Sequence, residues 1–235
     1  MTPAYPTKEE HVKLYYHPAS TTSRIVQQFA LDQGIELDYQ VVDLFTGEHL
    51  KPEYERINPN RLVPVLEDGD FRLTESAAII RYLADKAGSP AYPKDLKTRA
   101  RVNEMMDWFN SNVYKDFGYG LIYPQTFPHH KRPSDAIQAG TLEWGKQKTC
   151  DWLKILDQNL IGPGKAYLCG DKITLADYLG AEMIALGALI GCSYSAYPNI
   201  ERWMRNMKAL KSWPKVHEVI DGFAASLKDK PFVAI

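Results

Sequence analysis

A short stretch rich in Gly, Ser and Pro divides this chain into two parts with different hydrophobic patterns. Before residues 88–95 (GSPAYPKD), strand-like and helix-like patterns alternate, and after them the chain looks helical throughout. Such a composition suits an interdomain linker. We therefore predict an α/β domain over residues 11–87, a linker over 88–95 and an all-helical domain over 96–226.

The first part begins with a β-α-β unit. His11–Tyr16 alternates as a strand does, a helix runs from the hydroxyl-rich residues 20–23 to Gly34, and Leu37–Val42 is a second strand. The two strands should lie parallel, with a right-handed crossover. Residues 47–57 look irregularly helical, and residues 58–76 (NPNRLVPVLEDGDFRLTES) predict a strand, an Asp-Gly hairpin, a second strand and a helix start. The predicted order is β-α-β-α-β-β-α.

The second part contains long amphipathic segments interrupted by proline or glycine. Thr174 and Asp177 have the spacing of a capping box, which marks the start of one helix. The predicted helices are 96 to about 120, 136–160, 175–190, 199–210 and 214–226, with breaks at 123–124, 162–164, 197–198 and 213–214.

Composition excludes several functional classes. No apolar stretch reaches the roughly 18 residues that a membrane helix needs, and the start lacks the order of a secretory signal. We therefore expect a cytoplasmic protein. The net charge of -1 gives no long-range attraction to nucleic acid or to an anionic membrane. Three widely spaced cysteines form no metal-ligand pattern, so we expect no metal site.

Ser20 lies on the turn between the first strand and the first helix. A helix N-terminus offers free N–H groups and a partial positive charge, and a hydroxyl there could donate a hydrogen bond to an anion. The alternative is that Ser20, Thr21, Thr22 and Ser23 are only candidates for the helix N-cap.

A second cluster joins Val63-Pro64 to Glu75-Ser76. Pro64 cannot donate to a sheet, so it occupies an edge, a strand start or a cis turn. In cis, it would leave the backbone of Val63 free to pair with an extended peptide. Glu75 could bind an ammonium group, and Ser76 with the helix N–H groups could hold a carboxylate. The alternative is a capped helix after a hairpin.

A third cluster consists of His49, Lys51 and Arg61. These donors lie in loop-rich sequence and could bind a second carboxylate, although single charges of this kind are usually solvated. Their combination with the first two clusters is what favours a binding role.

Four segments, taken together, resemble a glutathione transferase. The resemblance spans Lys13 to about Phe223. Within the family, the chain is most similar to the serine-type, theta-like group, including the bacterial dichloromethane dehalogenases. The segments are HPASTTSR (17–24), VDLFTGEHL (42–50), NPNRLVPVLEDGDFRLTESAAIIRYLADK (58–86) and ITLADY (173–178). The resemblance implies a thioredoxin-like domain (βαβαββα) joined to an all-helical domain, usually in a homodimer, with glutathione as co-substrate.

The resemblance also implies roles for single residues. Ser20 would stabilise the glutathione thiolate, with Thr21 and Ser23 as possible substitutes. Tyr15 and Tyr16 compete for this role, but the tyrosine of other classes aligns with Pro18. Contacts with glutathione would come from His49, with help from Lys51, for the glycine carboxylate, from Val63 before Pro64 for the cysteinyl backbone, and from Glu75 and Ser76 for the γ-glutamyl end; Arg61 joins the carboxylate donors.

An aromatic-rich stretch would wall the pocket for the electrophile. It comprises Tyr114, Phe117, Tyr119, Tyr123 and Phe127, to which Tyr16 on the turn side adds a wall. Ser111 and Tyr114 stand where some theta-like members carry an acidic residue and an arginine. Dehalogenation and sulfate-ester chemistry are therefore less expected than simple conjugation of hydrophobic electrophiles, as in detoxification.

Two other functions compete with the transferase. A glutathione-dependent disulfide reductase or peroxidase would use the same thiolate against sulfur or oxygen. A non-catalytic transferase-like module for protein association would not need the hydroxyl turn or the Glu-Ser pair, both of which this chain contains.

Overall fold

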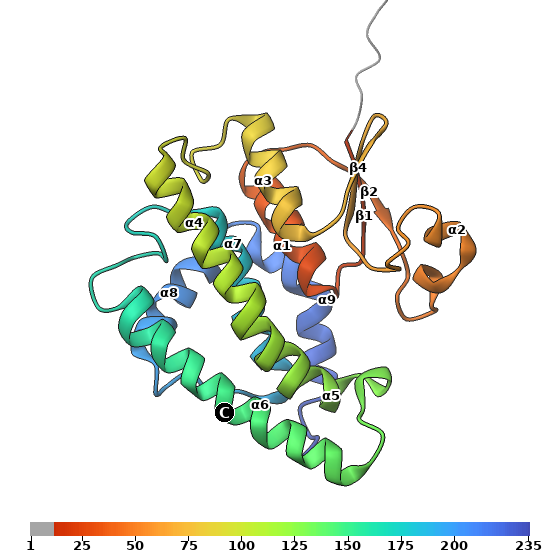
Figure 1. Cartoon of the computed structure of the whole chain (residues 1–235), viewed down its shortest axis with the longest axis vertical. Coiled ribbons are helices and arrows are strands. Elements are labelled where there is room, and N and C mark those ends of the chain that lie inside the picture. The colour runs from red at the N-terminus through yellow and green to blue at the C-terminus, as the bar shows by residue number, and fades with distance from the viewer. Residues whose placement is uncertain (1–11) are drawn as a thin grey trace, which may run out of the picture.

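A four-stranded sheet forms the centre of the N-terminal domain (Figure 1). The computed structural model describes residues 12–235, so His11, the predicted first residue of the first strand, lies outside the described residues. The strand order is β2-β1-β3-β4, with β1 and β2 parallel and β3 antiparallel to both β1 and β4. The strands are β1 (Lys13–Tyr16), β2 (Asp38–Val41), β3 (Val65–Asp68) and β4 (Phe71–Leu73).

Helices cover both faces of this sheet. On one face, α1 (Thr21–Asp32), which connects the parallel strands, and α3 (Ser76–Ala87) pack against the apolar side chains of β1 and β3. On the other face lie η1 (Glu48–Leu50) and α2 (Pro52–Glu55), whose Tyr54 meets Tyr15 with ring centroids 6.5 Å apart. Successive side chains of a strand face opposite sides. Leu14 therefore faces the main core, beneath α1 and α3. Tyr15 faces the opposite side, where it packs against a small core that includes Tyr54.

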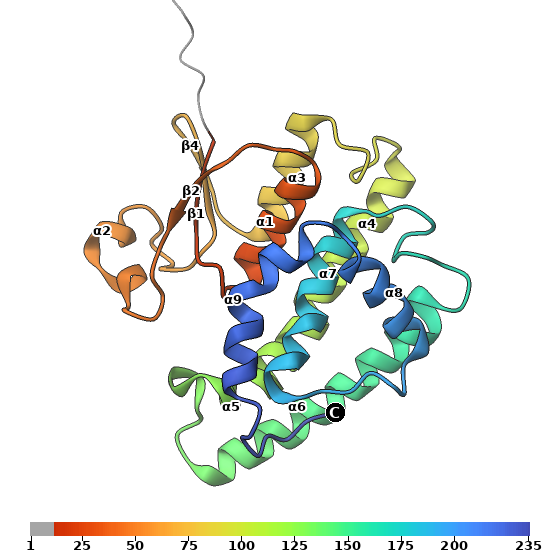
Figure 2. The same cartoon turned by 180° about the vertical axis from the view of Figure 1, so that it is seen from behind.

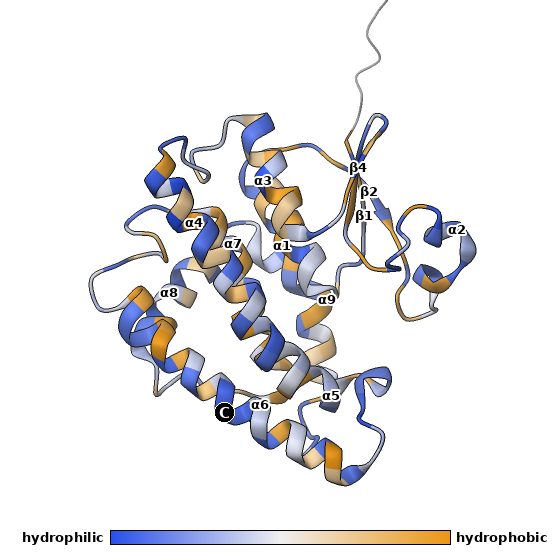
Figure 3. Cartoon of the chain, viewed as in Figure 1, coloured by the Kyte–Doolittle hydropathy of each residue, from blue (hydrophilic) through white to orange (hydrophobic). Residues whose placement is uncertain are grey.

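From Leu96 to Ile235, all of which the structure describes, every named element is a helix. Figures 1 and 2 show these helices gathered on the α1 and α3 side of the sheet. Polar residues occupy much of the outward surface of α4 and α6 (Figure 3), whereas Leu175 to Ile184 of α7 are all buried. The elements are α4 (Leu96–Trp108), η2 (Phe109–Ile122), α5 (Tyr123–Thr126), η3 (Pro128–His130), α6 (Asp135–Ile155), η4 (Leu156–Ile161), α7 (Leu175–Ala185), η5 (Leu186–Ile190), α8 (Pro198–Lys208) and α9 (Trp213–Ser226).

The architecture is thus the predicted thioredoxin-like domain followed by a helical domain. No helix or strand occurs within residues 88–95, between α3 and α4. The domain bounds expected from the sequence stay a prediction.

The expected break at Tyr123-Pro124 is wrong. Helical structure continues from α4 through η2, which has the wider turns of a π-helix, and on through α5 to Thr126. Pro124 has no N–H to donate within this run, and the carbonyl five residues before it, that of Tyr119, accepts instead from Arg132 Nη2 at 3.0 Å. The run therefore carries its aromatic side chains further than the sequence pattern indicates.

One apolar core joins the two halves of the chain. A single cluster of buried side chains includes Leu14 of β1, Ile79 of α3 and Leu179 of α7. The capping box predicted at Thr174 and Asp177 is confirmed and fixes the start of α7 within this core. The halves are therefore packed as one body through α1, α3 and α7.

Two glycines allow α6 to cross η2 at backbone contact. A Cβ atom at Gly145 of α6 would lie 2.6 Å from the carbonyl carbon of Gly120 in η2. Real Cβ atoms do not approach a backbone carbon so closely, so this crossing needs a residue without a side chain.

Candidate functional site

The turn that connects β1 to α1 presents the hydroxyl of Ser20. Ser20 is the N-cap of α1, and its Oγ accepts a hydrogen bond from the N–H of Ser23 at 3.3 Å. The N–H of Ser20 donates to the carbonyl of His17 at 2.9 Å, which closes the turn. Because the cap uses only a lone pair of Oγ, the hydroxyl hydrogen stays available as a donor.

Thr22 links this hydroxyl to the segment around Val63. The Thr22 hydroxyl donates to the Val63 carbonyl at 3.0 Å, and Ser20 Oγ lies 3.1 Å from Thr22 Oγ1. Since a carbonyl only accepts, the Thr22 hydrogen points to Val63, and Ser20 is the donor to Thr22 in this state. The Val63-Pro64 peptide is cis, as the sequence suggested.

A cavity of about 220 Å³ opens beside this turn. Residues of both domains line it, from the turn, the segments around His49 and Val63, the aromatic run and α9. The predicted residues among them are Ser20, Thr21, His49, Arg61, Val63, Tyr114, Tyr119, Tyr123 and Phe127. The lining thus combines hydroxyl and imidazole groups with aromatic and aliphatic side chains.

A smaller cavity of about 140 Å³ adjoins the first and shares Thr22, Leu62, Val63, Tyr114 and Tyr119 with it. Pro64, Glu75 and Ser76 also line it. Glu75 has φ 65° at the N-cap of α3, and Arg61, in the larger cavity, has φ 55°. Left-handed backbone at non-glycine residues costs on the order of 1–3 kcal/mol and concentrates at ligand sites. The two strained residues therefore mark the walls of both cavities.

Their surroundings lower the pKa values of three histidines that line the larger cavity, His17, His49 and His130. Burial lowers the pKa of His17, and the neighbouring His49 adds to the effect against the opposing charge of Asp43. Burial and the nearby His129 likewise lower the pKa of His49, whose Nδ1 is buried without a hydrogen-bond partner. An imidazole ring carries at least one N–H, so His49 can donate a hydrogen bond to a ligand oxygen.

Two tyrosines of the aromatic run are linked through their hydroxyl groups to the turn before α1. Tyr114 OH lies 2.9 Å from Tyr123 OH, which in turn lies 3.3 Å from the Thr21 hydroxyl. Burial raises the pKa of Tyr114 well above its ordinary value and raises that of Tyr123 as well. At neutral pH, both side chains are therefore un-ionised phenols.

Three predicted site residues do not line either cavity. Lys51 borders a separate hollow beside α2, because the chain turns between His49 and Lys51 at the end of η1. Tyr16 packs on Tyr39, with ring centroids 5.1 Å apart, since its strand position faces the core. Phe117 is fully buried because it lies on the inner side of η2.

Several lining residues were missed by the sequence reasoning. Thr22 was counted only among the helix caps, although its position beside Ser20 was a usable signal. The pair His129-His130, directly after Phe127-Pro128, brings imidazoles onto the aromatic wall. The remaining missed residues are spread along the chain and include His17, Phe45, Leu62, Leu186, Leu189 and Ile220.

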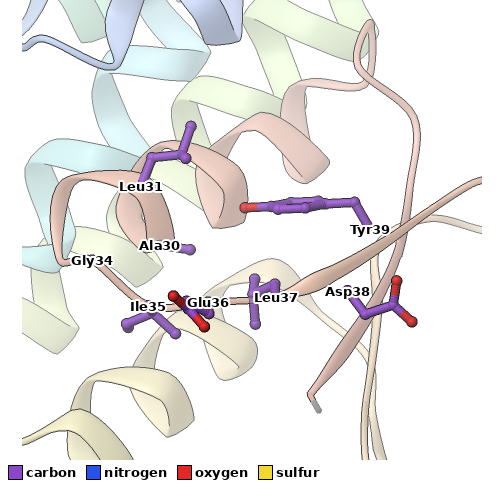
Figure 4. Close-up of a pocket in the computed structure, with 8 residues that line it drawn as sticks. All are labelled: Ala30, Leu31, Gly34, Ile35, Glu36, Leu37, Asp38 and Tyr39. Carbon is purple, nitrogen blue, oxygen red and sulfur yellow. The ribbon is translucent and has the colours of Figure 1, made fainter.

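A larger hollow, of about 490 Å³, lies between the end of α1 and β2 (Figure 4). Figure 4 shows Tyr39 extending towards α1, with Glu36 and Asp38 on the adjoining chain. None of the predicted site residues lines this hollow. Its volume therefore does not make it the better candidate.

Comparisons with known proteins agree on one family. Residues 14–91 match the model described as glutathione S-transferase, N-terminal domain, and residues 145–211 match the C-terminal domain of the same description. Human glutathione S-transferase theta-1 is 31% identical over 215 residues, which cover 89% of this chain and 88% of that protein.

Solved structures give the same result. A delta-class glutathione transferase of Nilaparvata lugens is 34% identical, with a TM-score of 0.79 and coverage of 92% of this chain and 98% of the other. Human glutathione transferase theta-2, solved with glutathione and an unknown ligand, is 29% identical, with a TM-score of 0.82 and coverage of 95% and 93%. Within residues 12–235, no helix is both long and apolar enough to cross a membrane.

Proposed function

The chain belongs to the glutathione S-transferase family, and from this premise we propose that it conjugates the thiolate of glutathione to small hydrophobic electrophiles, with Ser20 stabilising the thiolate. The main support is the Ser20 hydroxyl, which stands at the N-terminus of α1 on the wall of a cavity that both domains line. The attacking atom is the glutathione sulfur, and Ser20 acts on it as a hydrogen-bond donor.

Glutathione lies across the two adjoining cavities in this proposal. Glu75 binds the α-ammonium group of the γ-glutamyl end, and the Ser76 hydroxyl with the free N–H groups of α3 binds its carboxylate. The Val63 backbone pairs with the cysteinyl residue, which brings the sulfur to Ser20. His49 and Arg61 hold the glycine carboxylate, whereas Lys51 has no role because it borders another hollow.

The energetic demand on Ser20 is modest. Lowering the thiol pKa by about two units, which turns a few per cent of thiolate into a majority, needs roughly 2.7 kcal/mol. A hydrogen bond to a charged group contributes about 1.5–3 kcal/mol, and a helix N-terminus adds about 0.3–1 kcal/mol. When the sulfur arrives, the Ser20 hydrogen turns from Thr22 to the thiolate.

The electrophile lies against the aromatic wall of Tyr114, Tyr119, Tyr123 and Phe127. The volume of about 220 Å³, part of which the cysteinyl group occupies, favours small substrates. We further propose, from the family, that the protein is cytoplasmic and forms a homodimer. Sedimentation at micromolar concentration tests the oligomeric state.

Replacing Ser20 by Ala tests the activation step. We expect the thiol pKa of bound glutathione to rise by about one to two units, with a parallel loss of turnover at neutral pH, because one donor to the thiolate is gone. The thiolate absorbance of the bound complex, titrated with pH, measures this pKa. An unchanged thiol pKa would remove Ser20 from the mechanism.

A matched control separates activation from helix capping. Ser134 is the N-cap of α6 and accepts from the N–H of Ile137 at 3.3 Å, the same bond that Ser20 makes in α1. Ser134→Ala should lose similar stability, about 1 kcal/mol, and leave the thiol pKa unchanged.

The reaction class is tested by calorimetry with glutathione, followed by turnover of a chloronitrobenzene, a halomethane and a mixed glutathione disulfide. Binding with turnover of a carbon electrophile supports the transferase. Turnover of the disulfide alone favours a disulfide reductase, and absence of binding favours an interaction module.

A further inference from the structure

Three charged or chargeable side chains meet in the buried core behind the Ser20 turn. Arg24 of α1 donates from Nε to Glu182 Oε2 of α7 at 2.8 Å, and His217 Nε2 of α9 lies 3.3 Å from the same oxygen. The side chains of Arg24, Glu182 and His217 are 1%, 0% and 3% exposed, so water does not reach them. Figure 2 shows the three contributing helices, α1, α7 and α9, next to one another.

His217 is held with its second nitrogen towards the carboxylate. Its Nδ1 lies 3.1 Å from the Trp213 carbonyl, which only accepts, so Nδ1 carries a hydrogen. The Trp213 ring stacks on the imidazole at 3.7 Å and fixes its plane. Burial opposes ionisation of Glu182, but Arg24 and His217 outweigh it and hold the pKa of that carboxyl below its usual range. Glu182 is thus a carboxylate whose Oε1 has no hydrogen-bond partner.

The guanidinium of Arg24 also reaches the turn itself. Its Nη1 donates to the carbonyl of Ala19 at 2.8 Å, and that carbonyl belongs to the peptide bond that leads into Ser20. The N–H of Arg24 donates to the carbonyl of Ser20 at 2.9 Å. A peptide unit is planar, so a hydrogen bond to the Ala19 carbonyl also fixes the orientation of the bond from the peptide nitrogen to the Cα of Ser20.

Stability alone is a poor reason for such an arrangement. Removing two charges from water costs several kcal/mol per ion, and well-packed apolar side chains often serve as well or better. Neutralising the charge of Arg24 does not require Glu182 either, because an arginine at the protein surface is stabilised by solvent without the desolvation cost of a buried ion pair. What the network achieves is directional, because Glu182 holds Nε so that Nη1 faces the Ala19 carbonyl.

We propose that Glu182 and His217 of the helical domain are positioning residues for the Ser20 hydroxyl, acting through Arg24 and the Ala19 carbonyl. This inference rests on the proposed role of Ser20. Neither residue touches glutathione: they set the angle of the donor that does. The helical domain thereby determines how well the N-terminal domain activates the thiol.

A double-mutant cycle between Glu182→Gln and Ser20→Ala tests the proposal. In the Ser20 background, we expect Glu182→Gln to raise the thiol pKa of bound glutathione by about one unit and to lower kcat about tenfold at neutral pH. The KM for glutathione should change less than about twofold, because the groups that bind the tripeptide are untouched. In the Ser20→Ala background, Glu182→Gln should have no further effect on the thiol pKa.

The cycle distinguishes this inference from the proposed function. If Ser20→Ala alone leaves the thiol pKa unchanged, the role of Ser20 is wrong, whatever Glu182 does. If Ser20→Ala raises it and Glu182→Gln raises it additively, Glu182 acts by another route and the positioning role is overturned. An unchanged thiol pKa in Glu182→Gln overturns it as well.

Two further variants guard against a general loss of structure. His217→Gln is milder, and we expect a smaller rise in the thiol pKa that also vanishes in the Ser20→Ala background. Asp157→Asn is the matched control, since Asp157 is a buried carboxylate that accepts from the N–H groups of Asn199 and Ile200 at the start of α8, away from the turn. It should lower the unfolding temperature without moving the thiol pKa. If it moves the thiol pKa as Glu182→Gln does, the effect is one of stability and the inference fails.

Discussion

At the scale of single residues, the proposed contact of His49 with the glycine carboxylate predicts that glutathione binding depends on pH. Burial and His129 lower the pKa of His49 in the free protein, and in the proposed complex the glycine carboxylate would favour the imidazolium and raise that pKa. We then expect binding to take up a proton at pH values between the free and the bound pKa of His49, the free one lying below the ordinary value, and affinity to strengthen as pH falls through that window.

Calorimetry with S-methylglutathione measures this proton uptake, because that ligand has no thiol to ionise. Titrations in buffers of different ionisation enthalpy give the number of protons bound. We expect uptake in the unmodified protein, loss of uptake in His49→Gln and no change in Lys51→Gln, which alters a side chain two residues away beside another hollow. Equal effects of the two substitutions would contradict the assignment.

Local sequence logic identifies some of these residues and not others. Ser20, Glu75 and Ser76 are predictable because each stands where a strand or hairpin leads into a helix, and the free N–H groups of a helix start follow from the backbone alone. His49 and Lys51 differ by two residues in a short helical turn, and only the turn decides which one faces the cavity. Arg24 and Glu182 are 158 residues apart, so no local pattern predicts that they meet.

At the scale of elements, the capping box of α7 stabilises more than the start of that helix. Asp177 Oδ2 accepts from the N–H and the hydroxyl of Thr174, and Oδ1 accepts from the N–H of Leu168 and the indole N–H of Trp203. Four buried donors therefore depend on one carboxylate, which ties together the loop before α7, α7 itself and α8.

Asp177→Asn should therefore be more costly than the loss of an ordinary cap. In either orientation of the Asn side chain, its NH2 group faces two of the four donors. We therefore expect the free energy of unfolding to fall by on the order of 3 kcal/mol, against about 1 kcal/mol for Thr174→Ala. Urea denaturation of both variants measures this difference. Equal midpoints for the two variants would show that the additional bonds contribute nothing.

The elements themselves were largely predictable, and the exceptions have a physical reason. Hydrophobic periods of two and of about 3.6 residues located the four strands and most helices, because each element has one face in the core. The aromatic run continues past the break expected at Pro124, because another donor satisfies the carbonyl that the missing N–H of Pro124 leaves free. The hydrophobic period does not distinguish the wide turns of η2 from those of an ordinary helix.

At the scale of the whole molecule, the continuous core predicts that both domains unfold together. All five tryptophans lie between Trp108 and Trp213, so their fluorescence reports on the helical domain alone. Circular dichroism reports on both domains, and we expect the two melting curves to coincide because one apolar cluster runs from β1 to α9.

Glutathione should raise the melting temperature seen by tryptophan fluorescence, although most of its proposed contacts lie in the N-terminal domain. At a concentration of about 100 times Kd, the stabilisation is about 2.7 kcal/mol. Glu75→Ala should reduce the shift at the same concentration by weakening binding. A ligand-induced shift in circular dichroism without one in tryptophan fluorescence would mean that the domains unfold separately.

The contact between Gly120 and Gly145 opens a route of evolution that bypasses the active site. The helical run that contains Gly120 also carries Tyr114 and Tyr119, so its distance from α6 adjusts the aromatic wall. A methyl group at residue 145 does not fit unless the two backbones separate, and such a shift would change the position of the helical run without changing any side chain that lines the cavity. Lineages that differ in preferred substrate can therefore have identical pocket residues and differ at a crossing of two helices that no ligand touches.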